Sequence, residues 1–224
     1  MKMTDYRIAL LETTRRSLFY LPVRNVIQTI QGGAMMGAFT QTVCLIDYIA
    51  YIRGLDESKR TKYNYKAFVN DYLKKVNTNY DSGQIYAVRC SLVHTFGKSE
   101  AIKEIGITSV KFSHAEPNSH LGGKENEIQL DLGELLSDTI RAIWVYFEEL
   151  TASNDMQKIA EAASRGIYLI GVFEEGEQNL SEKYGKIHPL LEVLDNAPVD
   201  WGELKSRIKD LCLNIDKSKW YCKC

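Results

Sequence analysis

The stretch AMMGAFTQTVCLIDYIAYI, residues 34–52, decides the fold because it is apolar on most of its faces. A helix of this kind belongs in the core of a protein, so we predict a long central helix here, ended by Gly54. Gly37 and Ala38 are small enough to let neighbouring helices pack closely. Only four prolines and fifteen glycines occur in 224 residues, which leaves long uninterrupted stretches. The chain is therefore predicted to be mostly α-helical.

Helical patterns continue on both sides of this stretch. Apolar residues at helical spacing predict helices over residues 5–20, 23–30, 65–76, 133–150 and 201–213. We expect Pro22 to stop the first of these. Asp81, followed three positions later by Gln84, is typical of a helix start and predicts a helix through QIYAVRCSLVHTF.

One part of the chain has the alternation of a β-strand. Apolar and polar residues alternate over 110–112 and again over 128–132, and the intervening AEPNSHLGGKEN is rich in turn formers. This pattern predicts a small β-hairpin inserted between helices. His114 and His120 flank the loop, and we expect a solvated loop rather than a metal site.

The length and composition indicate one globular domain. Apolar residues make up 45% and charged residues 25% of the chain, as in ordinary folded proteins. The formal net charge is −1, which excludes a protein that coats nucleic acid or membrane by bulk charge. We expect a single domain over 1–224, in which 151–224 forms a helical extension of unassigned role.

The sequence shows neither a signal or membrane segment nor a recognised set of metal ligands, and these absences predict the compartment and the cofactors. Charges interrupt every apolar run in residues 1–20, so we expect a cytoplasmic protein without a membrane segment. The five cysteines are an odd number and are expected to be reduced. No cofactor and no metal is expected, although Cys222 and Cys224 leave open a metal-binding stress protein.

The residues that indicate chemistry are Arg89 and His94, both in the helix after Asp81. Five helical positions place them about 140° apart around the axis. They reach one cleft if His94 lies near the helix end and the long Arg89 side chain curls toward it. Arginine offers a planar charged fork for phosphate, and histidine transfers protons near neutral pH. Together they suit attack of an RNA 2′-hydroxyl on the adjacent phosphate without a metal.

These residues resemble the mark of the HEPN superfamily, in which an arginine and, four to six residues later, a histidine stand late in a helix. Neighbouring segments also fit: CLIDYI at residues 44–49, the aromatic-rich segment 68–73 and IY before the motif. The resemblance covers about 33–150. It implies a helical bundle that often forms a homodimer and joins two motifs in one cleft. Many relatives are metal-independent endoribonucleases of toxin–antitoxin or defence systems, which implies RNA or a nucleotide and an antitoxin-like protein as partners.

The resemblance makes Arg89 and His94 the candidate catalytic residues. The candidates for supporting or substrate-contacting residues around them are Asp47, Tyr86, Cys90 and Ser91. One position departs from the pattern: active members carry Asn, Asp or His directly after the arginine, where this chain has Cys90. A thiol is a weak hydrogen-bonding group. The alternative is therefore a non-catalytic HEPN-type binding or scaffold module, in which the pair of Arg89 and His94 supports a dimer or partner interface. Without a functional cleft, Arg89 is expected to cap carbonyls or pair with Asp47, and His94 to be packed.

Overall fold

The structure is a computed structural model and describes residues 3–54, 61–95, 100–114, 120–123, 126–170, 188–196 and 198–215. Within these ranges the chain is mostly α-helical, as predicted, and it includes a small two-stranded sheet.

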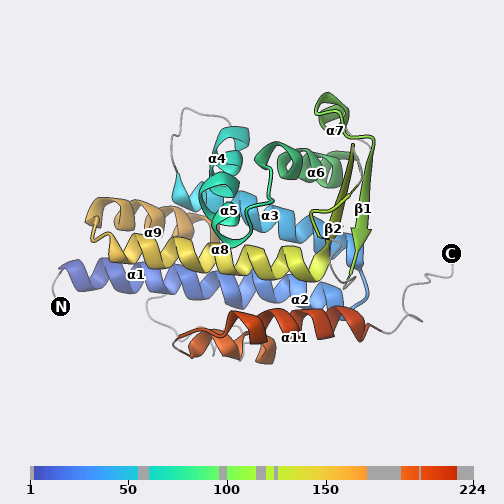
Figure 1. The fold of residues 1–224 in the computed structure, drawn as a ribbon. Helices are drawn as coiled ribbons and strands as arrows, with labels where there is room; N and C mark the ends of the chain where they lie inside the picture. The colour runs from blue at the N-terminus through green and yellow to red at the C-terminus, as the bar shows by residue number, and fades with distance from the viewer. Residues whose placement is uncertain are drawn as a thin grey trace.

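The predicted central helix is α3, Met35–Arg53. It packs against α2 (Arg24–Gln31), α8 (Leu132–Ala152) and α9 (Met156–Ile170), and it lies inside the bundle (Figure 1). Gly54 ends it in the left-handed region with a φ of 49°, as expected. By length and composition alone α3 could cross a membrane, but more than half of its apolar window is buried in the protein. Core helices share this property, so it says nothing of the compartment.

The first helix does not stop at Pro22, and this prediction is wrong. Helix α1, Met3–Leu18, continues through the π-helical turn η1, Phe19–Val23, directly into α2. Pro22 lies inside this wider turn, which accommodates a residue that has no N–H to donate. The buried side chains of Phe19 and Val23 hold the turn against the core. Burial therefore outweighs the helix-breaking tendency of proline here.

A layer of short helices covers the side of α3 that carries Asp47. Its elements are α4 (Thr61–Phe68), the π-helical turn η2 (Val69–Leu73), α5 (Lys74–Val76), α6 (Ser82–Thr95) and α7 (Glu100–Glu104). Helices α4 and α6 both pack against α3 and against each other. The predicted start of α6 is confirmed, because the N–H of Gln84 donates to Asp81 Oδ1 at 2.8 Å.

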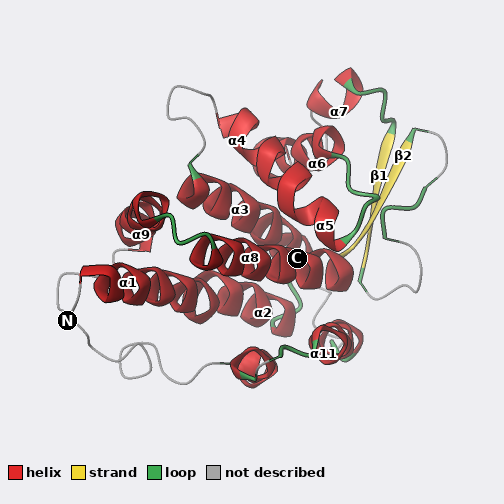
Figure 2. Cartoon of the chain, turned by 60° about the vertical axis from the view of Figure 1, so that its left-hand side comes forward, coloured by secondary structure: helices red, strands yellow, loops and turns green. Residues whose placement is uncertain are grey.

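The two strands are β1, Ser109–Ser113, and β2, Glu127–Asp131, and they pair in parallel rather than as the predicted hairpin. They lie at one end of the bundle beside α6 and α7 (Figure 2). The segment between them is long enough to return the chain to the end at which β1 began. Leu121 and Gly122 exchange backbone hydrogen bonds with Gln129 of β2. Strand β2 is thus hydrogen-bonded both to β1 and to Leu121 and Gly122 of the segment that precedes it.

The expected C-terminal extension is helical where the structure describes it. Helix α9 packs along α1, and α11 (Trp201–Leu213) has the predicted bounds and packs on α8. The 3₁₀ helix η3, Pro189–Asp195, precedes α11 and packs against it. In Figure 1, α11 lies on the opposite side of the bundle from α4 and α6. These residues therefore complete the bundle instead of standing apart from it.

Candidate functional site

Helix α6 positions the arginine and histidine of the motif. Its apolar residues Ile85, Val88 and Leu92 are buried against the bundle, which fixes the rotation of the helix. His94 lies in the last turn and is exposed, while the Arg89 side chain is only 17% exposed. The helix thus presents the histidine to solvent and keeps the arginine half-buried beside α3.

The structure brings the two side chains together as the sequence predicts. Arg89 Nη1 lies 3.2 Å from His94 Nε2. Because a guanidinium can only donate, His94 Nε2 must accept, which assigns the ring proton to Nδ1 and makes this imidazole neutral. The two side chains therefore meet because the long arginine side chain bends around the helix, although their positions lie about 140° apart around the axis.

Asp47 of α3 holds Arg89 from the inner side. Arg89 Nε donates to Asp47 Oδ2 at 2.6 Å, and the two side chains are 17% and 19% exposed. Burial raises the pKa of the Asp47 carboxyl, and the bond to Arg89 only partly offsets this. Burial also acts to lower the pKa of Arg89, but the bond to Asp47 raises it overall. The ion pair fixes the guanidinium, so Asp47 orients Arg89 instead of facing solvent.

The remaining sequence candidates differ in their access to a bound substrate. Tyr86 is partly exposed, and its ring packs edge-on against Tyr65 with centroids 5.5 Å apart. The thiol of Cys90 lies within hydrogen-bonding reach of both Tyr86 and Arg89. Ser91 is 2% exposed, which leaves it no path to a substrate. Tyr86 and Cys90 therefore border the site, whereas Ser91 belongs to the core.

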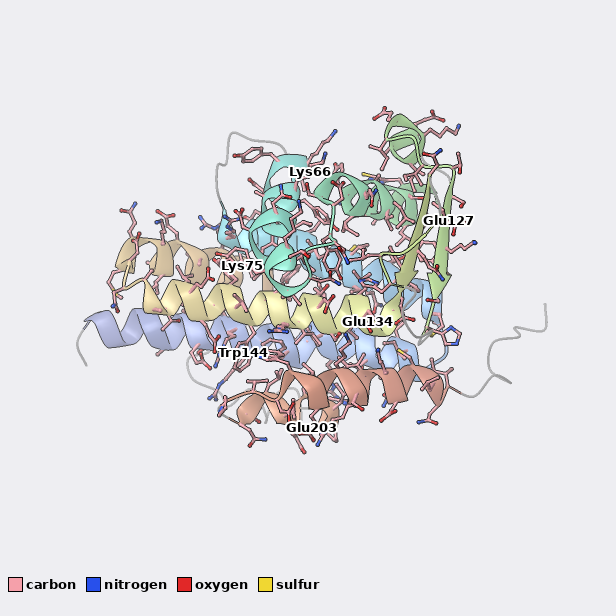
Figure 3. All side chains as sticks on the ribbon, viewed as in Figure 1. Lys66, Lys75, Glu127, Glu134, Trp144 and Glu203 are labelled. Carbon is pink, nitrogen blue, oxygen red and sulfur yellow. The ribbon has the colours of Figure 1, made fainter. Side chains whose placement is uncertain are left out.

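Two lysines that sequence reasoning missed lie beside the motif. Lys62 Nζ and Lys66 Nζ of α4 lie 5.7 and 6.0 Å from the centre of the Tyr86 ring. Lys66 projects from α4 on the side of the bundle that carries α6 (Figure 3). Their spacing of four residues, which places both on one face of a helix, was the available signal. The many charges before Tyr65 instead indicate a solvated link, which hides this helical spacing.

A cavity of about 420 Å³ adjoins the ion pair. Asp47 forms part of its wall, together with Tyr51, Asn64 and Arg165. Tyr51 is 46% exposed, which is unusual for so large a ring. The Arg165 guanidinium donates to the carbonyl of Ile52 at 2.8 Å and so caps the end of α3. The cavity offers an aromatic wall within one helical turn of Asp47.

His120 is not solvated, contrary to the expectation for this loop, whose residues 115–119 lie outside the described part of the chain. The His120 side chain is 5% exposed and bonds to Tyr80 and to the backbone of Asp131. The neighbouring Glu116 and the terminal Cys222 and Cys224 lie outside the described residues. Among the residues that the structure describes, no group of three metal-ligating side chains is placed to hold a metal ion.

Comparisons with protein-family models, curated proteins and solved structures found no match. The likeness to the HEPN superfamily therefore rests on the quoted residues and on the order of elements. What the geometry adds is a half-buried Asp47–Arg89 pair in contact with an exposed His94.

Proposed function

We propose that the chain is a HEPN-like protein that engages RNA through Arg89 and His94 and cleaves it as a metal-independent endoribonuclease. The observation that carries the proposal is the contact between His94 Nε2 and an arginine fixed by Asp47. A neutral exposed imidazole can take a proton, and a fixed guanidinium can stabilise a phosphate.

The reaction is attack of a ribose 2′-oxygen on the neighbouring phosphorus. Arg89 Nη1 turns from His94 to a non-bridging phosphate oxygen, which frees His94 Nε2 to accept the 2′-hydroxyl proton. The bond from phosphorus to the 5′-oxygen then breaks, and that oxygen takes a proton from water or from His94 of a second copy in its protonated, imidazolium form. The products are a 2′,3′-cyclic phosphate and a 5′-hydroxyl end. A homodimer that joins two motifs supplies both proton-transfer groups.

The surroundings of the motif support a nucleic-acid strand. Lys62 and Lys66 add positive charge around Tyr86, whose ring is partly open to solvent. Cations flanking an aromatic ring are suited to phosphates and a stacked base. This local patch explains how a chain with a net charge of −1 binds a polyanion.

A specific observation supports the alternative, a non-catalytic binding or scaffold module. Arg89 already bonds to Asp47 and His94, so the pair is satisfied without a ligand. Cys90 also stands where active HEPN members carry a stronger hydrogen-bonding residue. In this role the pair stabilises the end of α6 and a surface for a second copy or an antitoxin-like partner.

Cleavage of end-labelled single-stranded and hairpin RNA in EDTA tests the proposal. We expect cyclic-phosphate products from the wild type and a loss of about 10²–10⁴-fold in rate for His94→Ala. Arg89→Lys is expected to lose about 10²-fold, because lysine cannot form the fork. Arg16→Gln, an exposed arginine of α1, is the matched control and is expected to cleave normally.

Two results separate the readings. Wild-type protein that binds RNA and leaves it intact refutes the enzyme and supports the binding module. Equal cleavage by wild type and His94→Ala refutes the assigned site. Growth arrest on expression, relieved by His94→Ala, is the expected sign of a toxin.

A further inference from the structure

A second cavity lies between α8, α11 and the end of α5, and the motif has no part in it. Its volume is about 360 Å³. Asp138 and Arg141 of α8 line it on one side, Trp201 and Leu204 of α11 on another, and Val76 of α5 closes it. Ligand cavities begin at about 300 Å³, so this one fits a small molecule.

A buried carboxylate lies on the wall of this cavity. The Asp138 side chain is 10% exposed, and the Tyr80 hydroxyl donates to its Oδ2 at 3.1 Å. The Tyr80 hydroxyl lies 2.8 Å from His120 Nε2, while His120 Nδ1 accepts from the backbone N–H of Asp131. Because Nδ1 accepts, Nε2 carries the proton of a neutral ring. The chain from His120 through Tyr80 therefore gives Asp138 a hydrogen bond but no positive charge.

No lysine or arginine in the described ranges forms an ion pair with Asp138, although the charges of Lys205 and Arg141 act to lower its pKa. Burial raises its pKa to about 6 and lowers the pKa of His120 to about 4, so at neutral pH the acid is charged and the imidazole is not. Among the described residues, no lysine or arginine lies within 4.0 Å of its oxygens. A buried carboxylate without a cation is costly, and such groups gather at functional sites.

Arg141 is the complementary case. It lies three residues after Asp138 on α8, and its guanidinium lies 5.7 Å from the centre of the Trp201 ring. No carboxylate in the described part of the chain forms an ion pair with it. Lys205, which also lines the cavity, pairs with Glu134 at 2.5 Å where α8 faces α11 (Figure 3), and Lys209 shares the same carboxylate at 2.5 Å. Within the described residues, the cavity wall therefore holds an acid, Asp138, and a base, Arg141, that form no ion pair and lie three residues apart on one helix.

We propose that this cavity binds a small zwitterion, a free α-amino acid with an apolar side chain. The ammonium group of the ligand pairs with the Asp138 carboxylate, and the carboxylate of the ligand pairs with the Arg141 guanidinium. Each side chain thereby gains an ion pair. Trp201, Leu204 and Val76 provide the apolar wall for the side chain. An amino acid satisfies both charges at once, whereas an amine or an acid alone satisfies only one.

Calorimetric titration of the full chain with L-leucine, isoamylamine and isocaproate tests this site. The last two are leucine without its carboxylate and without its ammonium group. We expect leucine to bind, and each half molecule to bind at least about tenfold more weakly. Asp138→Asn is expected to weaken leucine binding about tenfold and to leave isocaproate binding unchanged. Arg141→Gln is expected to weaken leucine binding equally and to leave isoamylamine binding unchanged.

This crossed pattern separates ligand contact from damage to the fold, since a misfolded variant loses all three ligands. Arg16→Gln is the control and should bind leucine as the wild type does. The proposal is overturned if millimolar leucine gives no heat with folded wild type, if a half molecule binds as tightly as leucine, or if both variants keep wild-type affinity. His94→Ala should leave leucine binding unchanged, so the test is independent of the RNA proposal.

Discussion

Replacing Asp138 by asparagine is expected to change how the stability of the protein depends on pH. The carboxyl is 10% exposed, and burial raises its pKa from 3.8 to about 6. The folded protein therefore holds this proton more tightly than the unfolded chain does. Between pH 3.8 and 6 the unfolded state binds fewer protons, so rising pH favours unfolding. Asparagine still accepts the hydrogen bond from Tyr80, but it does not titrate and so removes this pH-dependent contribution to stability.

The size of the effect follows from the two pKa values. The difference between 3.8 and about 6, at about 1.4 kcal/mol per pH unit, is worth ~3 kcal/mol. About 2 kcal/mol of this falls between pH 4.5 and 7.5. His120, whose pKa burial lowers to about 4, acts in the opposite sense, since its contribution to stability rises with pH up to 6.5. The pH dependence of the wild-type stability contains both contributions. The difference in unfolding free energy between the variant and the wild type contains only that of Asp138, because His120 is present in both.

Urea unfolding followed by tryptophan fluorescence, at several pH values between 4.5 and 7.5, measures this difference. The free energy of unfolding of Asp138→Asn should gain about 2 kcal/mol on the wild type across the range. Ser137→Ala, a neighbour on α8 that removes no titrating group, should give a flat difference. A flat difference for Asp138→Asn as well would refute the claim that burial destabilises the charged acid.

Two glycines give further predictions, each checked by urea unfolding. In Gly166→Ala the new methyl group would lie 2.1 Å from Thr14 Cγ2 where α9 packs on α1, so we expect a loss of about 1–3 kcal/mol despite the better helix propensity of alanine. Gly37→Ala, at an exposed position of α3 where the methyl group would meet Thr29 Cγ2 at an ordinary contact distance of 3.4 Å, is its control and should lose no stability. Gly54→Ala combines a positive φ with a contact of 2.5 Å to the Arg165 guanidinium and should cost about 1–2 kcal/mol, and an unchanged midpoint would contradict the strain.

Local chemistry made much of the fold predictable. The run at 34–52 indicated α3 because a stretch without a polar face has to be buried, and the bounds of α11 followed from the helical spacing of its apolar residues. The two errors have non-local causes. Pro22 is tolerated because the neighbouring Phe19 and Val23 are buried in the core, and helix propensities do not include the free energy of this burial. The alternation in β1 and β2 is the same for parallel and antiparallel pairing, so it does not encode direction.

The two sites differ in how far sequence could predict them. Arg89 and His94 lie on one helix, so their contact follows from helix geometry and the reach of arginine. The hydrogen-bond chain that ends at Asp138 on the wall of the second cavity joins Tyr80, His120 and Asp138 from three segments that are distant in the sequence. His120 lies in the segment between β1 and β2, and the predicted hairpin does not place this segment against Tyr80.

The arginine does not have to choose between its structural and its chemical role. A guanidinium has five N–H donors, of which Asp47 takes the one on Nε and His94 takes one on Nη1. Cys90 lies within reach of another, which leaves two for a phosphate. A bound phosphate can therefore displace His94 while the pair with Asp47 stays intact. Lysine has a single nitrogen and cannot do both, so Arg89→Lys separates the two roles: a stable variant without cleavage supports the enzyme.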